Sequence, residues 1–273
     1  MSMRLLLLCT LLTLVLFGFV FWDIASKGAG ALSLEFLLTH PRKGMTAGGI
    51  LPAVIGTTYV TLLTALFAIP FGVATAIFLS EYARDTRSTR LIRAAIRNLA
   101  GVPSIIYGLF GVALFVQGMG MGPSLLASGL TLGLLTLPYI VATGEEALRN
   151  VPESYREGAL ALGATHWQSI HSVVLPAAMP GMVTGSLLGL SRAAGETAPI
   201  LFTGVAFYLR YLPGSVWDEF MALPYHLFIL STQHHAIHEV RPLAYGTALA
   251  LLGLVILLNV IAFLVRMRYK TSR

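Results

Sequence analysis

Long apolar runs alternate with short polar segments along the chain. A transmembrane helix needs about 20 consecutive residues that are predominantly apolar. Six runs come close to this length, and they span Leu5–Trp22, Val54–Leu79, Leu99–Val116, Pro123–Thr143, Val174–Ala194 and Tyr245–Val265. The pattern therefore predicts an all-α, polytopic membrane protein with six transmembrane helices.

Three prolines modify this pattern. Pro70 lies inside the second predicted helix, where its ring and its missing backbone N–H predict a kink. Pro176 and Pro180 lie near the beginning of the fifth predicted helix, where we expect them to mark its first turn.

The first apolar run has two interpretations. Arg4 followed by apolar residues is typical of a secretory signal peptide. The run Leu5–Trp22 is longer than the roughly 7–15 apolar residues of such a peptide, and no small-residue cleavage site follows closely. We therefore expect an uncleaved transmembrane helix, with a cleaved signal peptide as the alternative.

Composition agrees with a membrane protein. Hydrophobic residues make up 56% of the 273 positions and charged residues 11%, whereas soluble domains carry about 25% charged residues. The net charge of +6 arises from basic residues beside apolar runs, so it indicates membrane topology and lipid contact rather than nucleic-acid binding. Cys9 is the only cysteine, which excludes a disulfide within the chain.

Lys and Arg are unevenly distributed among the connecting segments. Cytoplasmic segments of membrane proteins are enriched in both residues. With the N-terminus inside, 12 of the 18 basic residues fall on the inner side, namely Arg4, Arg84, Arg87, Arg90, Arg93, Arg97, Arg149, Arg156, Arg266, Arg268, Lys270 and Arg273. This bias predicts that both termini are cytoplasmic.

The segment between the second and third runs has a helical stripe of arginines at positions 87, 90, 93 and 97. Leu91, Ile92, Ile96 and Leu99 are apolar residues interleaved with this stripe. The pattern predicts an amphipathic helix that lies at the cytoplasmic surface of the membrane.

The longest outer connection, residues 197–243, contains three closely spaced histidines. His234 and His238 are four residues apart, which would place them on one face of a helix and allow them to bind a metal. No H-E-x-x-H pattern accompanies them. We expect His234, His235 and His238 to belong to a solvated polar loop, with a metal-dependent hydrolase embedded in the membrane as the remote alternative.

The inner segment between the fourth and fifth runs is too long to be a simple connector. The residues Glu157–Ser169 are predicted to form a helix with many small side chains, which another protein could approach closely. From the residues alone, a docking site for a partner and a surface helix without a partner both remain open.

This segment resembles the EAA loop of ABC-type importer permeases, with the pattern E-A-A-x3-G-x9-I-x-L-P. The matching residues here are Glu157, Gly158, Ala159, Gly163, Val173, Leu175 and Pro176, with Gly158 and Val173 as departures. The resemblance implies that the segment 145–176 docks on a cytoplasmic ATPase. No Gly-Lys dipeptide of a phosphate-binding loop occurs in this chain, so ATP hydrolysis would lie on a partner chain. We expect neither enzymatic activity nor a cofactor.

Two further stretches are similar to the phosphate-specific permeases of the Pst system. They are "NLAGVPSIIYGLFGVALFV" (98–116) and "SRAAGETAPILFTG" (191–204), and the second is closer to A-type subunits than to C-type subunits. The resemblance implies a type I importer permease fold over residues 51–266, preceded by a first helix and outer loop in residues 1–50. It also implies a bacterial inner membrane location and a complex with a C-type permease, two ATPase subunits and an external phosphate-binding protein.

Arg192 and Glu196 lie at the end of the fifth apolar run, spaced so that they share one helix face. Charges in a membrane segment are costly and therefore indicate function, although a mutually neutralising structural pair is the alternative. An arginine suits phosphate because its planar fork donates two parallel hydrogen bonds to an oxyanion. We expect Arg192, Glu196 and the adjacent Thr197 to contact the translocated substrate.

The same helix carries small residues every four positions, at Gly181, Gly185 and Gly189. Such a ridge lets a neighbouring helix pack closely. Alternatives to a phosphate importer are a permease for molybdate, sulfate or phosphonate, and a passive anion channel. The EAA-like segment disfavours a channel, because a channel needs no ATPase.

Overall fold

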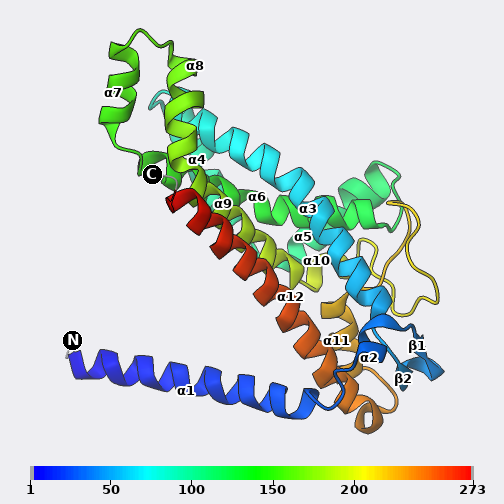
Figure 1. Ribbon diagram of the computed structural model, residues 1–273. Helices are drawn as coiled ribbons and strands as arrows, with labels where there is room; N and C mark the ends of the chain where they lie inside the picture. The colour runs from blue at the N-terminus through cyan, green and yellow to red at the C-terminus, as the bar shows by residue number, and fades with distance from the viewer. Residues whose placement is uncertain (1–2, 272–273) are drawn as a thin grey trace.

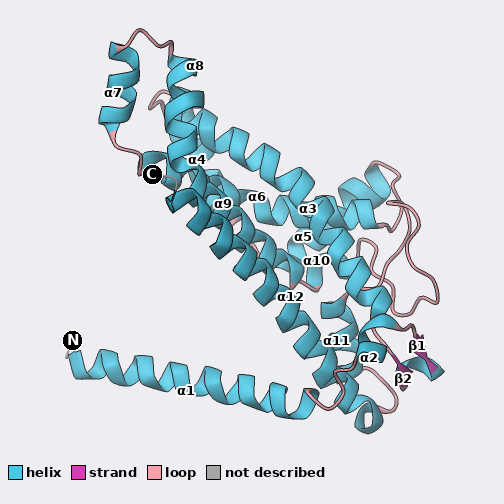
Figure 2. Ribbon diagram, viewed as in Figure 1, coloured by secondary structure: helices cyan, strands magenta, loops and turns pink. Residues whose placement is uncertain are grey.

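The computed structural model describes residues 3–271 of the chain. Its helices and strands are α1 (Met3–Gly28), α2 (Leu34–Leu38), β1 (Pro41–Arg42), β2 (Ala47–Gly48), α3 (Leu51–Ile77), α4 (Arg87–Leu99), α5 (Ser104–Gly111), α6 (Leu125–Arg149), α7 (Glu153–Ala161), α8 (His166–Ser169), α9 (Leu175–Ala194), α10 (Ala198–Leu201), α11 (Leu223–Thr232) and α12 (Ile237–Thr271). Figures 1 and 2 show that helices dominate the molecule. Short 3₁₀ or π-helical turns occupy Lys43–Met45, Phe78–Tyr82, Val112–Gly118 and Ile170–Val174.

Five helical segments among residues 3–271 are long and apolar enough to cross a membrane. They are Leu5–Gly28, Leu51–Tyr82, Leu125–Arg149, His166–Ala194 and Ile237–Arg268. A sixth span results if α4 and the helix that follows it are counted together. The all-α membrane fold expected from the sequence is therefore confirmed.

The third predicted helix, Leu99–Val116, begins later than expected: helical structure runs from Ser104 to Gly118, and Leu99 belongs to α4. The structure ends α4 at Leu99 and begins α5 at Ser104, and the two helical segments meet at an angle of 102°. Pro103 explains the break, because it disfavours the helical conformation at Val102 and cannot donate a backbone hydrogen bond.

Pro176 lies in the first turn of α9, as expected, but Pro180 lies inside the helix and not in its first turn, and α9 continues an earlier helical segment. Helical structure already begins at His166 and reaches Pro176 through a π-helical turn at Ile170–Val174. In that turn the backbone N–H of Leu175 bonds to the carbonyl of Ile170, five residues back. The wider turn accommodates a proline ring that would clash with the preceding turn of a regular α-helix.

The body of the molecule is built around α6. It packs against α3 and α9, and α12 in turn packs against α9. Residues from all three central helices meet in a buried cluster near the α7 end, namely Ala76, Leu148, Val174, Ala178 and Met182 together with Val151. Because α6 contacts both neighbours, a displacement of one end of α6 would reach α3 and α9.

The first helix diverges from this body. Figure 1 shows α1 in blue with its N-terminal half away from the other helices. None of its apolar span is buried, and its contact with α12 lies near Gly28, whose backbone approaches Tyr245 closely. The exposed apolar surface of α1 is suited to lipid or to another membrane helix.

The end of the molecule opposite α7 holds a two-stranded antiparallel hairpin, with Pro41 paired to Gly48 and Arg42 paired to Ala47. Residues 197–243, expected as a solvated polar loop, instead contain α10, α11 and much of a packed core. Their buried apolar residues are Ile200, Leu209, Phe220, Met221, Leu223, Ile229 and Leu230. The apolar content of this segment, rather than its histidines, determines its structure.

The amphipathic helix predicted from the arginine stripe is confirmed as α4. Thr86 caps it by accepting a hydrogen bond from the backbone N–H of Thr89. Leu91 and Ile92 are exposed, whereas Arg93 is turned inward to Glu145 of α6. The apolar residues of α4 therefore remain available to lipid, while one of its arginines fixes the helix to the body.

Candidate functional site

Arg192 and Glu196 lie on either side of a break in the chain. α9 ends at Ala194, and Glu196 stands in the turn that precedes α10 rather than on a shared helix. Arg192 Nε is 3.5 Å from Glu196 Oε1, beyond the usual hydrogen-bond length. The side chain of Arg192 is 61% exposed and that of Glu196 is 18% exposed, so the carboxylate restrains an arginine that stays accessible to a ligand.

The sequence accounts for this break. Gly195 is the residue after the last turn of α9, and Pro199 lies in the first turn of α10, where its missing N–H costs nothing. Thr197 precedes α10 without a side-chain cap and is partly exposed. Arg192, Glu196 and the free Thr197 hydroxyl therefore lie within six consecutive positions at the end of α9.

Close packing holds the break in place. An added Cβ at Gly108 of α5 would lie 3.0 Å from the Ala198 carbonyl and 3.1 Å from the Pro199 Cα. On the other side, the Ser191 hydroxyl bonds to Asn259 Oδ1 of α12 at 3.3 Å. The backbone around Arg192 is thus fixed from two directions, while its side chain is not.

The three glycines of the predicted ridge face α6. An added Cβ would lie 2.8 Å from the Ala147 Cβ at Gly181 and 3.0 Å from Tyr139 at Gly189, and at Gly185 it would overlap Thr143. The contacts at Gly181 and Gly185 are too short for a real side chain, and the contact at Gly189 would need Tyr139 to shift by a few tenths of an ångström. The ridge therefore sets the distance between α9 and α6 below the site.

The segment Glu153–Ser169, which we call the α7–α8 hairpin, projects beyond the membrane helices (Figure 1). The single helix predicted for Glu157–Ser169 is wrong, because the chain turns between Ala161 and His166. Gly163 has a φ of +86°, a conformation that glycine adopts without strain. The N–H groups of Gly163 and Ala164 bond back to Leu160 and Ala159, which is the hydrogen-bond pattern of a glycine-terminated helix end.

The α7–α8 hairpin presents apolar side chains to the surroundings. No residue of α7 is buried, and Leu162 is 91% exposed. Leu160 and Trp167 are also exposed. Apolar side chains gathered on a projecting element are typical of a surface that contacts another protein or a membrane. Of the residues in the EAA-like pattern, Glu157, Gly158 and Ala159 lie on α7, whereas Leu175 and Pro176 lie farther along in α9.

The histidines of residues 197–243 do not converge. His234 is buried, its Nε2 lies 2.7 Å from the Gly44 carbonyl, and its Nδ1 accepts from the Ala236 N–H. Both ring nitrogens are therefore engaged with the backbone, and His235 stacks on the same ring. Within residues 3–271 no three metal-ligating side chains form a group that could hold a metal. The alternative of a metal-dependent hydrolase has no support in this arrangement.

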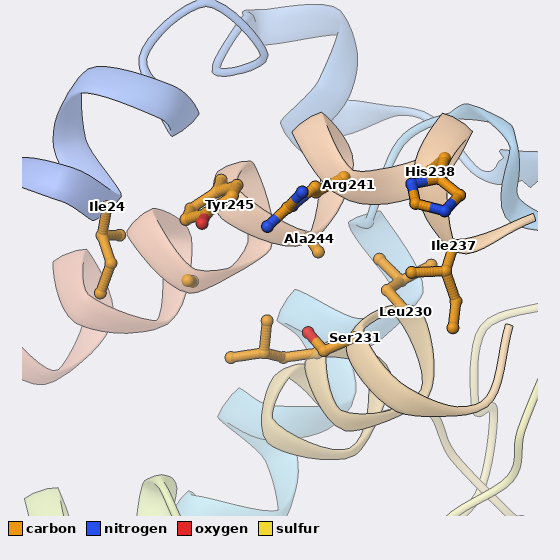
Figure 3. Close-up of a pocket in the computed structure, with 10 residues that line it drawn as sticks. Ile24, Leu230, Ser231, Ile237, His238, Arg241, Ala244 and Tyr245 are labelled. Atoms are coloured by element: carbon orange, nitrogen blue, oxygen red, sulfur yellow. The ribbon is translucent and has the colours of Figure 1, made fainter.

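His238 lies apart from these two, at a cavity of about 480 Å³ between α1, α11 and α12. Figure 3 shows its ring at the rim, with Arg241 extending toward Tyr245. The other labelled lining residues are mainly aliphatic, including Ile24 and Leu230. His238 therefore belongs to a mixed polar and apolar cavity rather than to a histidine cluster.

Two ion pairs near the α7–α8 hairpin escaped the sequence analysis. Arg156 pairs with Glu81 at 2.8 Å, and Arg93 pairs with Glu145 at 2.9 Å. Each pair joins residues more than 50 positions apart, so no local spacing indicates it. The available signal was weaker, since Glu81 is an acidic residue directly after an apolar run and Arg156 directly precedes the EAA-like pattern.

The chain is similar in sequence to known membrane transport proteins. The chain is 36% identical over 250 residues to the phosphate transport system permease protein PstA 1 of Mycobacterium tuberculosis, covering 90% of this chain and 80% of that protein. It is 35% identical over 196 residues to the probable ABC transporter permease protein YqgI of Bacillus subtilis, covering 72% and 67%.

Solved structures show the same fold at lower identity. An inward-facing structure of the MetNI methionine ABC transporter matches with a TM-score of 0.66 at 19% identity, covering 81% of this chain and 95% of the other. A bacterial alginate ABC transporter matches with a TM-score of 0.62 at 14% identity, covering 97% and 92%. The family model described as "binding-protein-dependent transport system inner membrane component" matches residues 68–270. The chain therefore belongs to this family of membrane components of binding-protein-dependent transport systems.

Proposed function

We propose that this chain is a permease subunit of an ATP-driven importer of inorganic phosphate. The observation that carries the substrate assignment is the similarity to PstA 1 of Mycobacterium tuberculosis, a phosphate transport permease by name, over 90% of this chain. The similarity extends through the α9–α10 break and the α7–α8 hairpin, because both fall inside the region matched by the family model.

Two features of the chain support the proposed assembly: it has no phosphate-binding loop, and it exposes apolar side chains on the α7–α8 hairpin. It has no Gly-Lys dipeptide of a phosphate-binding loop, so a separate ATPase must supply hydrolysis. The exposed Leu160, Leu162 and Trp167 provide apolar surface on which that ATPase docks. The complete complex contains this chain, a related C-type permease, two ATPase subunits and an external phosphate-binding protein.

The chain spans the bacterial inner membrane several times, with both termini and the α7–α8 hairpin in the cytoplasm. The excess of Lys and Arg in the corresponding segments supports this orientation. In Figure 1 the C-terminus and the α7–α8 hairpin lie at the same end of the body, as this topology requires. Residues 1–50 supply the first helix and an outer segment, and residues 51–266 form the permease domain.

Arg192, Glu196 and Thr197 form the contact site for phosphate along the translocation path. The exposed guanidinium donates paired hydrogen bonds to phosphate oxygens. Glu196 neutralises Arg192 between transport events and makes the path less attractive to anions in general. Thr197 offers a hydroxyl that donates to a third oxygen.

The test is uptake of labelled phosphate per assembled complex in proteoliposomes. Arg192→Gln keeps much of the side-chain length but loses the charge and the fork. We expect uptake to fall about 10- to 100-fold, since a hydrogen bond to a charged group contributes about 1.5–3 kcal/mol. Arg210→Gln is the matched control, because Arg210 is an exposed arginine away from the break.

The double variant Arg192→Gln with Glu196→Gln separates translocation from a purely structural pair. It removes both charges, so assembly recovers, but uptake stays low if phosphate needs the arginine. Normal uptake per complex in the double variant would overturn the role of Arg192. Competition by unlabelled sulfate and molybdate at equal concentration distinguishes a phosphate importer from a general oxyanion importer.

A further inference from the structure

The π-helical turn Phe78–Tyr82, at the end of α3, is a point where several distant segments converge. Its Glu81 side chain is only 4% exposed. A carboxylate so deeply buried is stable only when it is paired and hydrogen-bonded. Its partner is Arg156 of the α7–α8 hairpin, which lies 75 positions away in the chain.

The two side chains meet fork to fork. Arg156 Nη2 donates to Glu81 Oε1 at 2.8 Å, and Arg156 Nε donates to Glu81 Oε2 at 3.1 Å. Two parallel bonds fix the relative orientation of the groups as well as their distance. The pair therefore restrains α7 against the end of α3 in rotation and in translation.

Arg156 is also bonded to the end of α6. Its Nη2 donates to the Leu148 carbonyl at 3.0 Å, and its Nη1 donates to the Val151 carbonyl at 2.9 Å. The Leu148 carbonyl belongs to the last turn of α6, where helix carbonyls lack a partner within the helix. One guanidinium thus ties α7 to α3, to α6 and to the segment between α6 and α7.

A second arginine, on a different helix, also bonds to this turn. Arg93 of α4 donates to Glu145 Oε1 of α6 at 2.9 Å and also bonds the Leu79 carbonyl within the π-helical turn. α7 itself contributes no buried residue. α8 continues through the turn Ile170–Val174 into α9, so the α8 arm of the hairpin is attached to the body by the helix itself. The attachment of α7 to α3 and α6, in contrast, depends strongly on Arg156.

We propose that the Glu81–Arg156 pair is the mechanical joint through which movement of the α7–α8 hairpin is passed to α3 and α6. Both are positioning residues, because neither contacts phosphate or ATP. The joint rests on the proposed function, since the hairpin moves when a docked ATPase closes. Without the joint the hairpin and α9 follow the ATPase while α3 and α6 lag, so ATP is hydrolysed without transport.

The first experiment measures phosphate transported per ATP hydrolysed by the reconstituted complex. In Arg156→Gln the ratio falls about tenfold or more, because Glu81 is left buried without its partner. In Arg156→Lys the charge is kept but the fork is lost, so the ratio falls by an intermediate amount, about threefold. Arg90→Gln, which removes an exposed pair with Asp85 at 3.6 Å, leaves the ratio unchanged.

This ratio distinguishes a joint from a general stabilising role. Mere destabilisation reduces the number of assembled complexes but not the phosphate moved per ATP by those that remain. Ratios equal to that of the unchanged complex in both Arg156 variants would overturn the joint. Failure of the unchanged complex to move phosphate would instead overturn the proposed function.

A second experiment does not depend on the substrate. Spin labels at Ser154 of α7 and at Leu66 of α3, both exposed, report the distance between the hairpin and α3. In the otherwise unchanged complex this distance stays constant between the nucleotide-free and ATP-bound states. In the Arg156→Gln complex, the distribution of distances between the two labels broadens or shifts when ATP binds. A nucleotide-dependent shift of equal size with Arg156 present would show that α7 and α3 do not move as one unit.

Discussion

His226 is a polar residue that is buried although one of its ring nitrogens, Nδ1, has no hydrogen-bond partner within the described residues. It lies in α11, outside the candidate membrane spans, with 3% of its surface exposed. Burial, with a smaller contribution from the nearby His234, lowers the pKa of His226 to about 4. The folded protein therefore keeps this ring neutral at pH values at which an exposed histidine takes up a proton.

Stability should accordingly depend on pH below neutrality. His226 has an ordinary pKa of 6.5 in the unfolded chain and about 4 in the folded one. As pH falls below 6.5 the unfolded chain binds a proton that the folded chain does not. The free energy of unfolding then drops by about 1.4 kcal/mol per pH unit. We expect the unfolding temperature, followed by tryptophan fluorescence, to fall between pH 7 and 5.

His226→Phe should flatten this dependence, because it removes the titrating group and the unpaired nitrogen while keeping a ring. His235→Gln is the control, since His235 is exposed and should contribute little to the slope. If the unfolding temperature of the His226→Phe protein falls just as steeply between pH 7 and 5, other groups cause the pH dependence.

Local spacing indicated the contact between Arg192 and Glu196 but not the helix end between them, and their role in transport stays a prediction. Arg192 and Glu196 are four positions apart, and the structure brings them to 3.5 Å. Glu81 and Arg156 are 75 positions apart, and their pairing depends on how α3, α6 and α7 meet. Without an account of that packing, Glu81 is indistinguishable from any acidic residue after an apolar run.

At the scale of elements, prolines and an altered helical turn explain where the observed helices differ from the predicted ones. Apolar periodicity located the membrane helices but could not show that Pro103 divides one run at 102°. It also missed the π-helical turn Ile170–Val174, which lets a helix continue through Pro176. In both cases the outcome depends on how neighbouring helices support an altered turn, which hydropathy does not encode.

The α7–α8 hairpin yields a prediction at this scale. Leu162→Asp should leave the fold of the chain intact, because the side chain is 91% exposed. In the complex the substitution would bury an unpaired carboxylate against the ATPase. Burying a polar group without a hydrogen-bond partner costs about 2–7 kcal/mol. We expect recovery of the ATPase with a tagged permease to fall at least tenfold.

Leu34→Asp provides the comparison, since Leu34 is an exposed leucine on α2 at the opposite end of the molecule. Amounts of each permease in the membrane are measured alongside ATPase recovery. Normal recovery with Leu162→Asp would mean that the ATPase binds elsewhere.

At the scale of the whole molecule, two groups of segments lie at opposite ends of the membrane helices. The α7–α8 hairpin and the end of α3 lie at one end, and the β1–β2 hairpin lies at the other (Figure 1). Basic residues predicted which end is cytoplasmic. The divergence of α1 from the body had no sequence signal, because its apolar composition is equally suited to lipid and to protein.

Accessibility to a membrane-impermeant thiol reagent checks this arrangement. With Cys9 replaced, cysteines at Ser88 and Ser154 should resist labelling from outside intact cells and become reactive once the membrane is opened. A cysteine at Ser215, in the exposed loop between α10 and α11, should be labelled in intact cells. Labelling of all three cysteines from outside intact cells would contradict the proposed topology.

The exposed side chains of the α7–α8 hairpin also bear on how long the chain survives in a cell. Until the ATPase arrives, Leu160, Leu162 and Trp167 present apolar surface to the cytosol. Chaperones and proteases continuously remove proteins that display such surface. If the ATPase docks on this surface as proposed, we expect an unassembled permease to be short-lived, because docking shields these side chains. The supply of ATPase then sets the number of permeases that persist, so subunit balance is reached by selective degradation rather than by matched synthesis alone.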